Sequence, residues 1–62
     1  MENKVKYYRE TAGLSQEQLG NAVGITRQAV SAIELGINQL TISTALKMAK
    51  VFNIKWQDLF SE

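Results

Sequence analysis

The sequence predicts an all-α domain of five short helices, and two kinds of signal indicate this fold class. Apolar residues recur at intervals of three and four, as they do along one face of a helix. Residues that favour the start or the end of a helix separate these apolar stretches. A chain of 62 residues has room for one small core, so we expect residues 1–62 to form a single domain.

The first helix is expected from Asn3 to about Ala12. Val5, Tyr8 and Ala12 form one apolar stripe at helical spacing. Gly13 follows at the position where a helix commonly ends on a glycine. The sequence therefore places a short amphipathic helix at the start of the chain.

Two further helices joined by a tight turn are expected between Ser15 and Gly36. Ser15 is a favourable N-cap for the first of them, with Gln18 as its capping-box partner. Gly24 ends that helix, because the left-handed conformation needed there costs glycine little. Thr26 is expected to cap the next helix. The apolar residues that we expect to point inward from this segment are Leu19, Ala22, Val23, Ile25, Val30 and Ile33.

The outward face of the second of these helices carries polar side chains that can read bases in DNA. Arg27 can donate two hydrogen bonds to guanine, and Gln28 can pair with adenine. Ser31 and Thr26 can reach bases or nearby phosphates. Taken alone, this pattern is equally compatible with a solvated helix face.

A fourth helix and a short fifth helix are expected to close the domain. Thr41 is the expected cap and Asn53 the expected end of the fourth, with Ile42 and Ala45 on its buried side. In the closing segment, Trp56 and Phe60 either complete the core or form a patch between subunits. The complete expected core is Val5, Tyr8, Leu14, Leu19, Val23, Ile25, Val30, Ile33, Leu46, Ala49, Phe52 and Leu59.

Residues 14–36, LSQEQLGNAVGITRQAVSAIELG, resemble the helix-turn-helix of the phage repressor and Cro family, the xenobiotic-response-element (XRE) type of bacterial regulator. Apolar, small and glycine positions of that motif are all occupied, and the flanking segments also match. The resemblance implies a five-helix, lambda-repressor-like DNA-binding domain. The stretch Gly36-Ile37-Asn38 is similar to the corresponding segment of the phage lambda repressor, and it departs from the commoner pattern with a basic residue and a proline.

The resemblance also implies roles for individual residues. Arg9 and Glu34 would form an ion pair between the first helix and the recognition helix, although Arg9 could instead bind a phosphate. Gln16 would bind a phosphate with its backbone N–H and side chain while its amide braces a recognition side chain; the alternative is an exposed helix starter. Asn38 would touch a phosphate or a base edge, unless it is simply a left-handed loop residue. Ile37 is a candidate core or dimer contact.

Composition limits the chemistry that the chain can perform. It has no cysteine and no histidine, which removes disulfides, thiolate metal sites and the usual nucleophile–base pairs. We therefore expect no catalytic residue, no metal, no cofactor and no enzymatic activity. No apolar run approaches the roughly 20 residues of a membrane span, and the N-terminus lacks a signal-peptide hydrophobic region. A cytoplasmic protein with no membrane partner is expected.

These observations favour a sequence-specific regulator that binds double-stranded DNA as a homodimer on a palindromic operator, most simply a repressor. A net charge of only +1 argues slightly against DNA binding, although the distribution of charge matters more than its sum. A protein-interaction module, such as an antitoxin or an adaptor, is the alternative, favoured by the low charge and by the apolar residues 54–60. No small-molecule ligand is expected, because the chain is too short for a separate sensing domain.

Overall fold

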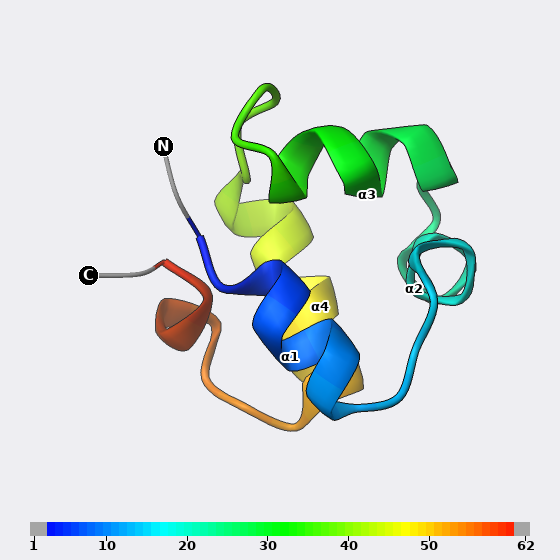
Figure 1. Cartoon of the computed structure of the whole chain (residues 1–62). Helices are drawn as coiled ribbons and strands as arrows, with labels where there is room; N and C mark the ends of the chain where they lie inside the picture. The colour runs from blue at the N-terminus through cyan, green and yellow to red at the C-terminus, as the bar shows by residue number, and fades with distance from the viewer. Residues whose placement is uncertain (1–2, 61–62) are drawn as a thin grey trace.

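The chain folds into four α-helices followed by one short 3-10 helix (Figure 1). This computed structural model describes residues 3–60. The elements are α1 (Val5–Thr11), α2 (Gln16–Val23), α3 (Arg27–Glu34), α4 (Ile42–Phe52) and η1 (Trp56–Leu59). Since residues 3–60 include no strand, the prediction of an all-α fold is confirmed.

The expected fifth α-helix is not confirmed, because the closing segment forms a single 3-10 turn. Asn53 adopts a left-handed conformation, with φ 58°, and ends α4. Two bonds of the i to i+3 type then close the turn: Asp58 N–H donates to Lys55 O at 3.0 Å, and Phe60 N–H donates to Gln57 O at 3.1 Å. The segment is too short to continue into the wider α-helical bonding pattern.

The three predicted N-caps are confirmed. Each cap side chain accepts a hydrogen bond from the backbone N–H three residues later, so that one otherwise unpaired donor of the first turn is satisfied. The pairs are Ser15 with Gln18, Thr26 with Ala29, and Thr41 with Thr44. Ser15 and Gln18 also form the full capping box, because the Gln18 side chain accepts from the Ser15 N–H at 2.8 Å.

The turn between α2 and α3 depends on two glycines with different roles. Gly24 has φ 79°, in the left-handed region that a side chain disfavours. Gly20 lies inside α2, where the turn folds back so closely that the N–H of Ile25 donates to the Gly20 carbonyl at 2.9 Å. A Cβ atom on Gly20 would lie only 2.6 Å from the Ile25 carbonyl oxygen. Only a residue without a side chain permits this approach of α3 to α2.

The core contains most of the expected residues, but the buried face of α4 differs from the prediction. Ile42 and Leu46 are exposed, whereas Met48 is fully buried. Two apolar stripes run along α4, and the one that contains the small Ala45 and Ala49 packs inward because it allows a closer approach to the other helices. The buried apolar side chains are Val5, Leu19, Val23, Val30, Ile33, Leu40, Ala45, Met48, Ala49 and Leu59.

Some other expected core positions lie at the edge of the core or outside it. Tyr8, Ile25 and Phe52 are half-buried and pack against it, and Leu14 is also half-buried. Ala22 is exposed, which corrects its expected inward position. Because α2 has only eight residues, the single apolar stripe formed by Leu19 and Val23 is enough to pack it against the core.

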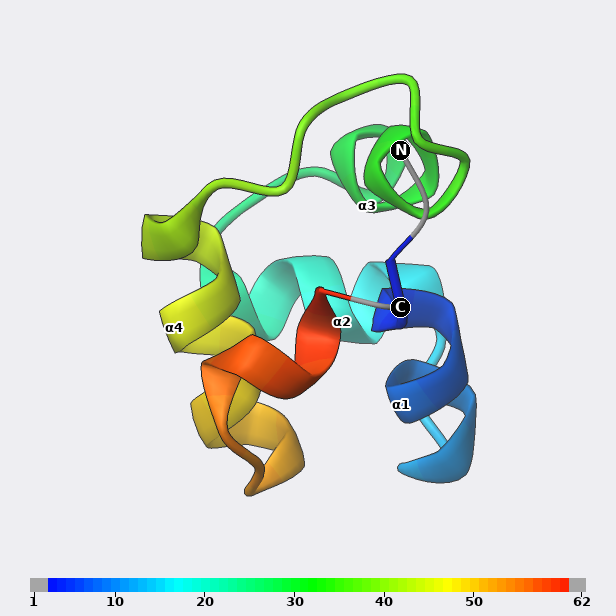
Figure 2. The ribbon, with the colours of Figure 1, turned by 90° about the vertical axis from the view of Figure 1, so that its left-hand side faces the viewer.

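Helix α3 lies at one edge of the molecule (Figures 1 and 2). Figure 2 views the domain along α3 and shows α2 running across beneath it. Lys4, immediately before α1, lies next to η1, where its N–H donates to the Leu59 carbonyl at 2.9 Å. Helix α3 is thus supported on the side that faces α2, and its opposite side faces the solvent.

We predict that Gly20→Val destabilises the fold by about 2 kcal/mol or more, because the new side chain overpacks the α2–α3 turn. Asn21→Val is the matched control, since Asn21 is exposed on the same helix and the two changes introduce the same side chain. The control should stay within about 0.5 kcal/mol of the parent. Urea unfolding followed by circular dichroism measures both, and equal effects would contradict the close-approach explanation.

Candidate nucleic-acid interface

The exposed face of α3 is a stripe of side chains at helical spacing. Arg27 and Gln28 in the first turn are exposed, and Ser31 one turn later is half-buried. Leu35, at the C-cap, retains right-handed helical geometry and continues the stripe by another turn. Val30 and Ile33 occupy the opposite, buried face. The outer face of α3 is therefore polar and ends in an apolar residue, while its inner face is packed against the core.

The polar side chains at the start of α3 are available to an incoming partner. Within residues 3–60, the side chains of Arg27 and Gln28 make no hydrogen bond or ion pair. Thr26 is exposed, but its Oγ1 already accepts from the Ala29 N–H at 3.0 Å. Its hydroxyl hydrogen can still be donated, so Thr26 suits a phosphate or base acceptor better than a donor.

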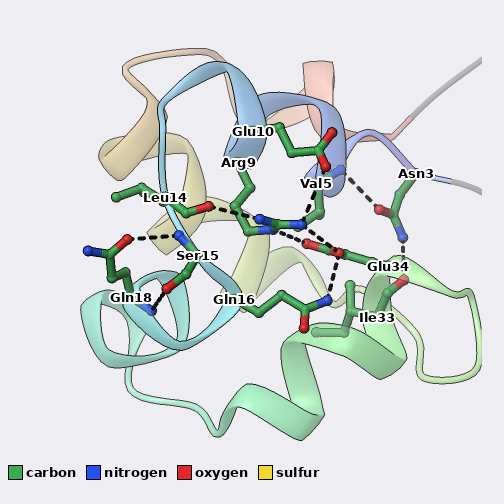
Figure 3. A network of polar contacts seen from close by, with 10 residues as sticks. All are labelled: Asn3, Val5, Arg9, Glu10, Leu14, Ser15, Gln16, Gln18, Ile33 and Glu34. Carbon is green, nitrogen blue, oxygen red and sulfur yellow. Dashed lines mark hydrogen bonds and ion pairs between the residues drawn. The ribbon is translucent and has the colours of Figure 1, made fainter.

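Behind α3, one carboxylate connects three helices (Figure 3). Glu34 accepts from Arg9 of α1 through Nε at 2.6 Å and Nη2 at 3.3 Å. It also accepts from Nε2 of Gln16 in α2 at 3.0 Å. The Glu34 side chain is only 4% exposed and that of Arg9 only 11%. The structure thus contains the ion pair that the resemblance implied, with Gln16 as a third member.

Arg9 is fully engaged in the interior. Its Nη1 donates to the carbonyl oxygen of Leu14 at 2.8 Å, in addition to the two bonds to Glu34. The hydrogen bond to Glu34 raises the pKa of the Arg9 guanidinium above its ordinary value, while burial acts in the opposite direction. Arg9 is therefore charged in the folded protein, and its position does not suit the alternative role of phosphate ligand.

Gln16 occupies the first position of α2, and it is half-buried rather than fully exposed. Its side-chain amide donates to Glu34, and not to a recognition side chain as the resemblance implied. One Nε2 hydrogen remains for another acceptor, because an amide nitrogen carries two. The backbone N–H groups of the first turn also lie at the positive end of the helix dipole.

The loop after α3 places Ile37 and Asn38 at the surface. Their backbone N–H groups both donate to the Ala32 carbonyl, at 2.9 and 3.1 Å, and this fixes the loop against the end of α3. Asn38 is not left-handed; among residues 3–60, Asn53 is the non-glycine residue with positive φ. The alternative reading of Asn38 as a left-handed loop residue is therefore wrong.

A cavity of about 260 Å³ lies beside this loop. The residues that line it are Asn3, Gly36, Ile37, Asn38, Gln39, Leu40 and Phe60. Phe60 and its neighbour Trp56 are half-buried and pack against the core, with their rings edge to face at 5.8 Å. Ile37, by contrast, is 75% exposed. Of the three proposed dimer contacts, Ile37 thus offers the most surface to a partner.

Leu35 lies at the end of the exposed face of α3 and was not among the candidate site residues predicted from the sequence. It is 71% exposed, next to the polar stripe, where an apolar side chain can contact a thymine methyl group. The signal was present in the sequence, because Leu35 follows Arg27 and Ser31 at successive intervals of four.

Residues 3–60 contain no group of three or more Asp, Glu, His or Cys side chains that could hold a metal ion. Among the same residues, no helix has the length and hydropathy needed to cross a membrane.

Comparison with known proteins identifies related sequences. The chain matches the helix-turn-helix family over residues 5–59. It is 50% identical over 60 residues to the uncharacterized HTH-type transcriptional regulator YgzD of Bacillus subtilis, covering 97% of this chain and 91% of the relative. An uncharacterized HTH-type regulator of Methanocaldococcus jannaschii is 43% identical over 60 residues, with the same coverage.

A solved structure has a similar fold. The crystal structure of the restriction-modification controller protein C.AhdI from Aeromonas hydrophila superimposes with a TM-score of 0.84 at 32% sequence identity. The match covers 92% of this chain and 83% of that protein. The overall fold of this chain is therefore also found in a controller protein.

We predict that Glu34→Ala destabilises the fold by about 3–5 kcal/mol, because it leaves the Arg9 charge buried without its partner. Glu10→Ala is the control, since Glu10 lies 3.9 Å from Arg9 but is exposed, and it should cost at most about 1 kcal/mol. Guanidinium unfolding measures both. A Glu34 effect no larger than that of Glu10 would show that the pair does not anchor α3.

Proposed function

We propose that this chain, which belongs to the XRE-type helix-turn-helix family of transcriptional regulators, is a sequence-specific double-stranded DNA-binding repressor that acts as a homodimer on a palindromic operator. The observation that carries the proposal is the stripe formed by the exposed Arg27 and Gln28 and the half-buried Ser31 on a helix held from behind by the Arg9–Glu34 pair. In this proposal residues 1–62 act as one DNA-binding domain in the cytoplasm. No cofactor, effector ligand or catalytic step is part of it.

The base contacts follow from the chemistry of the stripe. Arg27 donates two hydrogen bonds to guanine, and Gln28 pairs with adenine, both in the major groove. Ser31 contacts a base one turn along the helix, and Leu35 extends the stripe towards a thymine methyl group. Thr26, whose hydroxyl hydrogen remains available, donates to a phosphate or a base acceptor.

The phosphate contacts flank the reading helix. Gln16 binds one phosphate through its backbone N–H at the start of α2 and through its remaining amide hydrogen. Asn38 binds another from the loop beyond α3, where its exposed side chain can reach the sugar-phosphate backbone. Contacts of this kind set the register of the protein on DNA and carry little sequence information.

A dimer supplies the contacts that a single weakly charged domain lacks. Residues 35–46 contain no charged residue, and they include the exposed Leu35, Ile37, Ile42 and Leu46. We assign Ile37, together with Trp56 and Phe60, to the contact between two copies. Two copies related by a two-fold axis would then read half-sites about 34 Å apart.

We predict that Arg27→Ala weakens binding to a selected cognate duplex by about 1–3 kcal/mol and relaxes the preference at one base pair. Lys50→Ala is the matched control for loss of a positive charge, because Lys50 is exposed in the last turn of α4. Selection from a random duplex pool followed by fluorescence anisotropy measures both. Unchanged affinity and base preference in Arg27→Ala would show that α3 does not read DNA.

We predict that Ile37→Glu shifts the protein from dimer to monomer, because each copy would bury an unpaired carboxylate in the proposed contact. Gln39→Glu places the same charge on the same loop at another exposed residue and should dissociate the dimer less. Analytical ultracentrifugation over a range of concentrations gives the two dissociation constants. Equal dissociation in the two variants would remove Ile37 from the interface.

A protein-interaction module is the second candidate function, favoured by the exposed apolar residues of the uncharged stretch 35–46. The two functions differ in their response to salt, because contacts with phosphates release counterions. For the DNA-binding function, we predict a steep loss of affinity for random duplex between about 50 and 200 mM salt. Anisotropy titrations at both concentrations test this, and the absence of binding at the lower one would favour the module.

A further inference from the structure

We infer that Gln16 is a positioning residue that sharpens base discrimination by holding the carboxyl-terminal end of α3 through Glu34. This role goes beyond its proposed phosphate contact, and its consequence for DNA rests on the proposed function. The observation behind it is the hydrogen bond from Gln16 Nε2 to Glu34 Oε1 at 3.0 Å, which joins the first residue of α2 to the last residue of α3 (Figure 3).

Helix α3 is held at its two ends by different means. At its start, the short turn fixes it to α2, with Ile25 bonded to Gly20 and Thr26 as the cap. At its end, Glu34 accepts bonds from Arg9 of α1 and Gln16 of α2. The Asn3 side chain also donates to the Ile33 carbonyl at 2.8 Å near this end, and Val30 and Ile33 are buried. Loss of a bond to Glu34 therefore loosens this end of α3 and allows a small tilt about the turn. The Gln16 bond closes the α2–α3 pair at the end opposite the turn.

A tilt about the turn affects the reading residues unequally. Arg27 lies next to the turn, whereas Ser31 and Leu35 lie about 6 and 12 Å further along a helix that rises 1.5 Å per residue. The same tilt therefore displaces Ser31 and Leu35 more than Arg27. We expect loss of the Gln16 bond to relax the base preferences farthest from the turn.

Glutamine suits this position because it is neutral and carries two amide hydrogens. One hydrogen binds Glu34 without adding charge to the buried pair with Arg9. The other remains available for a phosphate. A single side chain can thus hold α3 against α2 and contact the DNA backbone.

Gln16→Met tests the inference, because methionine has a similar length and no hydrogen-bond donor. Gln18→Met is the matched control, since Gln18 also lies in the first turn of α2, but its hydrogen bonds are both with Ser15. Dissociation constants are measured on the selected duplex, its single-base variants and a random duplex at one salt concentration. Thermal unfolding shows that each variant is folded.

In Gln16→Met, the ratio of specific to random affinity should fall about threefold to tenfold, the range expected for loss of one ordinary hydrogen bond. The loss of preference should be largest at the bases farthest from the one read by Arg27. Gln18→Met should leave the ratio unchanged. If Gln16→Met weakens specific and random binding by the same factor, Gln16 is a phosphate ligand only and the inference is wrong.

Amide hydrogen exchange in the DNA-free protein tests the positioning separately from DNA binding. The N–H groups of Leu35 and Gly36, bonded to Ser31 and Ile33, should exchange about threefold to tenfold faster in Gln16→Met. They should exchange at the parent rate in Gln18→Met. Unchanged exchange in Gln16→Met would overturn the positioning role. If no duplex is selected at all, the proposed function fails, while exchange still decides whether Gln16 holds α3.

Discussion

The hydrogen-bonded ion pair between Arg9 and Glu34 is the constraint on which the arrangement of this domain depends. Helices of seven to eleven residues are too short to be stable alone in water, so each requires its neighbours. A buried pair adds little net stability compared with apolar packing, yet it strongly disfavours arrangements that separate the partners. It thereby holds α1 against α3 through two residues that are 25 positions apart in the chain.

Because α3 is held by contacts on its inner face and at its start, the fold does not depend on contacts made by its outer face. Val30 and Ile33 provide its buried contacts, and the Gly20 turn sets its approach to α2. Arg27 and Gln28 are consequently exposed and uncommitted within residues 3–60. This division between a packed back and an open front allows a small domain to present side chains rigidly to a partner.

The low net charge of +1 is consistent with the way the proposed contacts are distributed. Neutral groups make many of them: the amides of Gln16 and Asn38, the hydroxyls of Thr26 and Ser31, and a helix N-terminus. Such groups bind phosphates or bases by hydrogen bonding. The uncharged stretch 35–46 provides the exposed apolar surface that we assign to the proposed contact with a second copy.

The sequence alone determined the features that depend on contacts within about five residues: the three caps, the capping box, the Gly24 turn and hence the helix-turn-helix. It also indicated the α3 stripe, although Leu35 was overlooked, and family resemblance supplied the pairing of Arg9 with Glu34. Only the tertiary structure decided which stripe of α4 is buried, that the closing segment is a 3-10 turn, and that Gln16 donates to Glu34. Local hydrogen bonds are encoded in neighbouring residues, whereas these outcomes depend on how helices distant in the chain fit together.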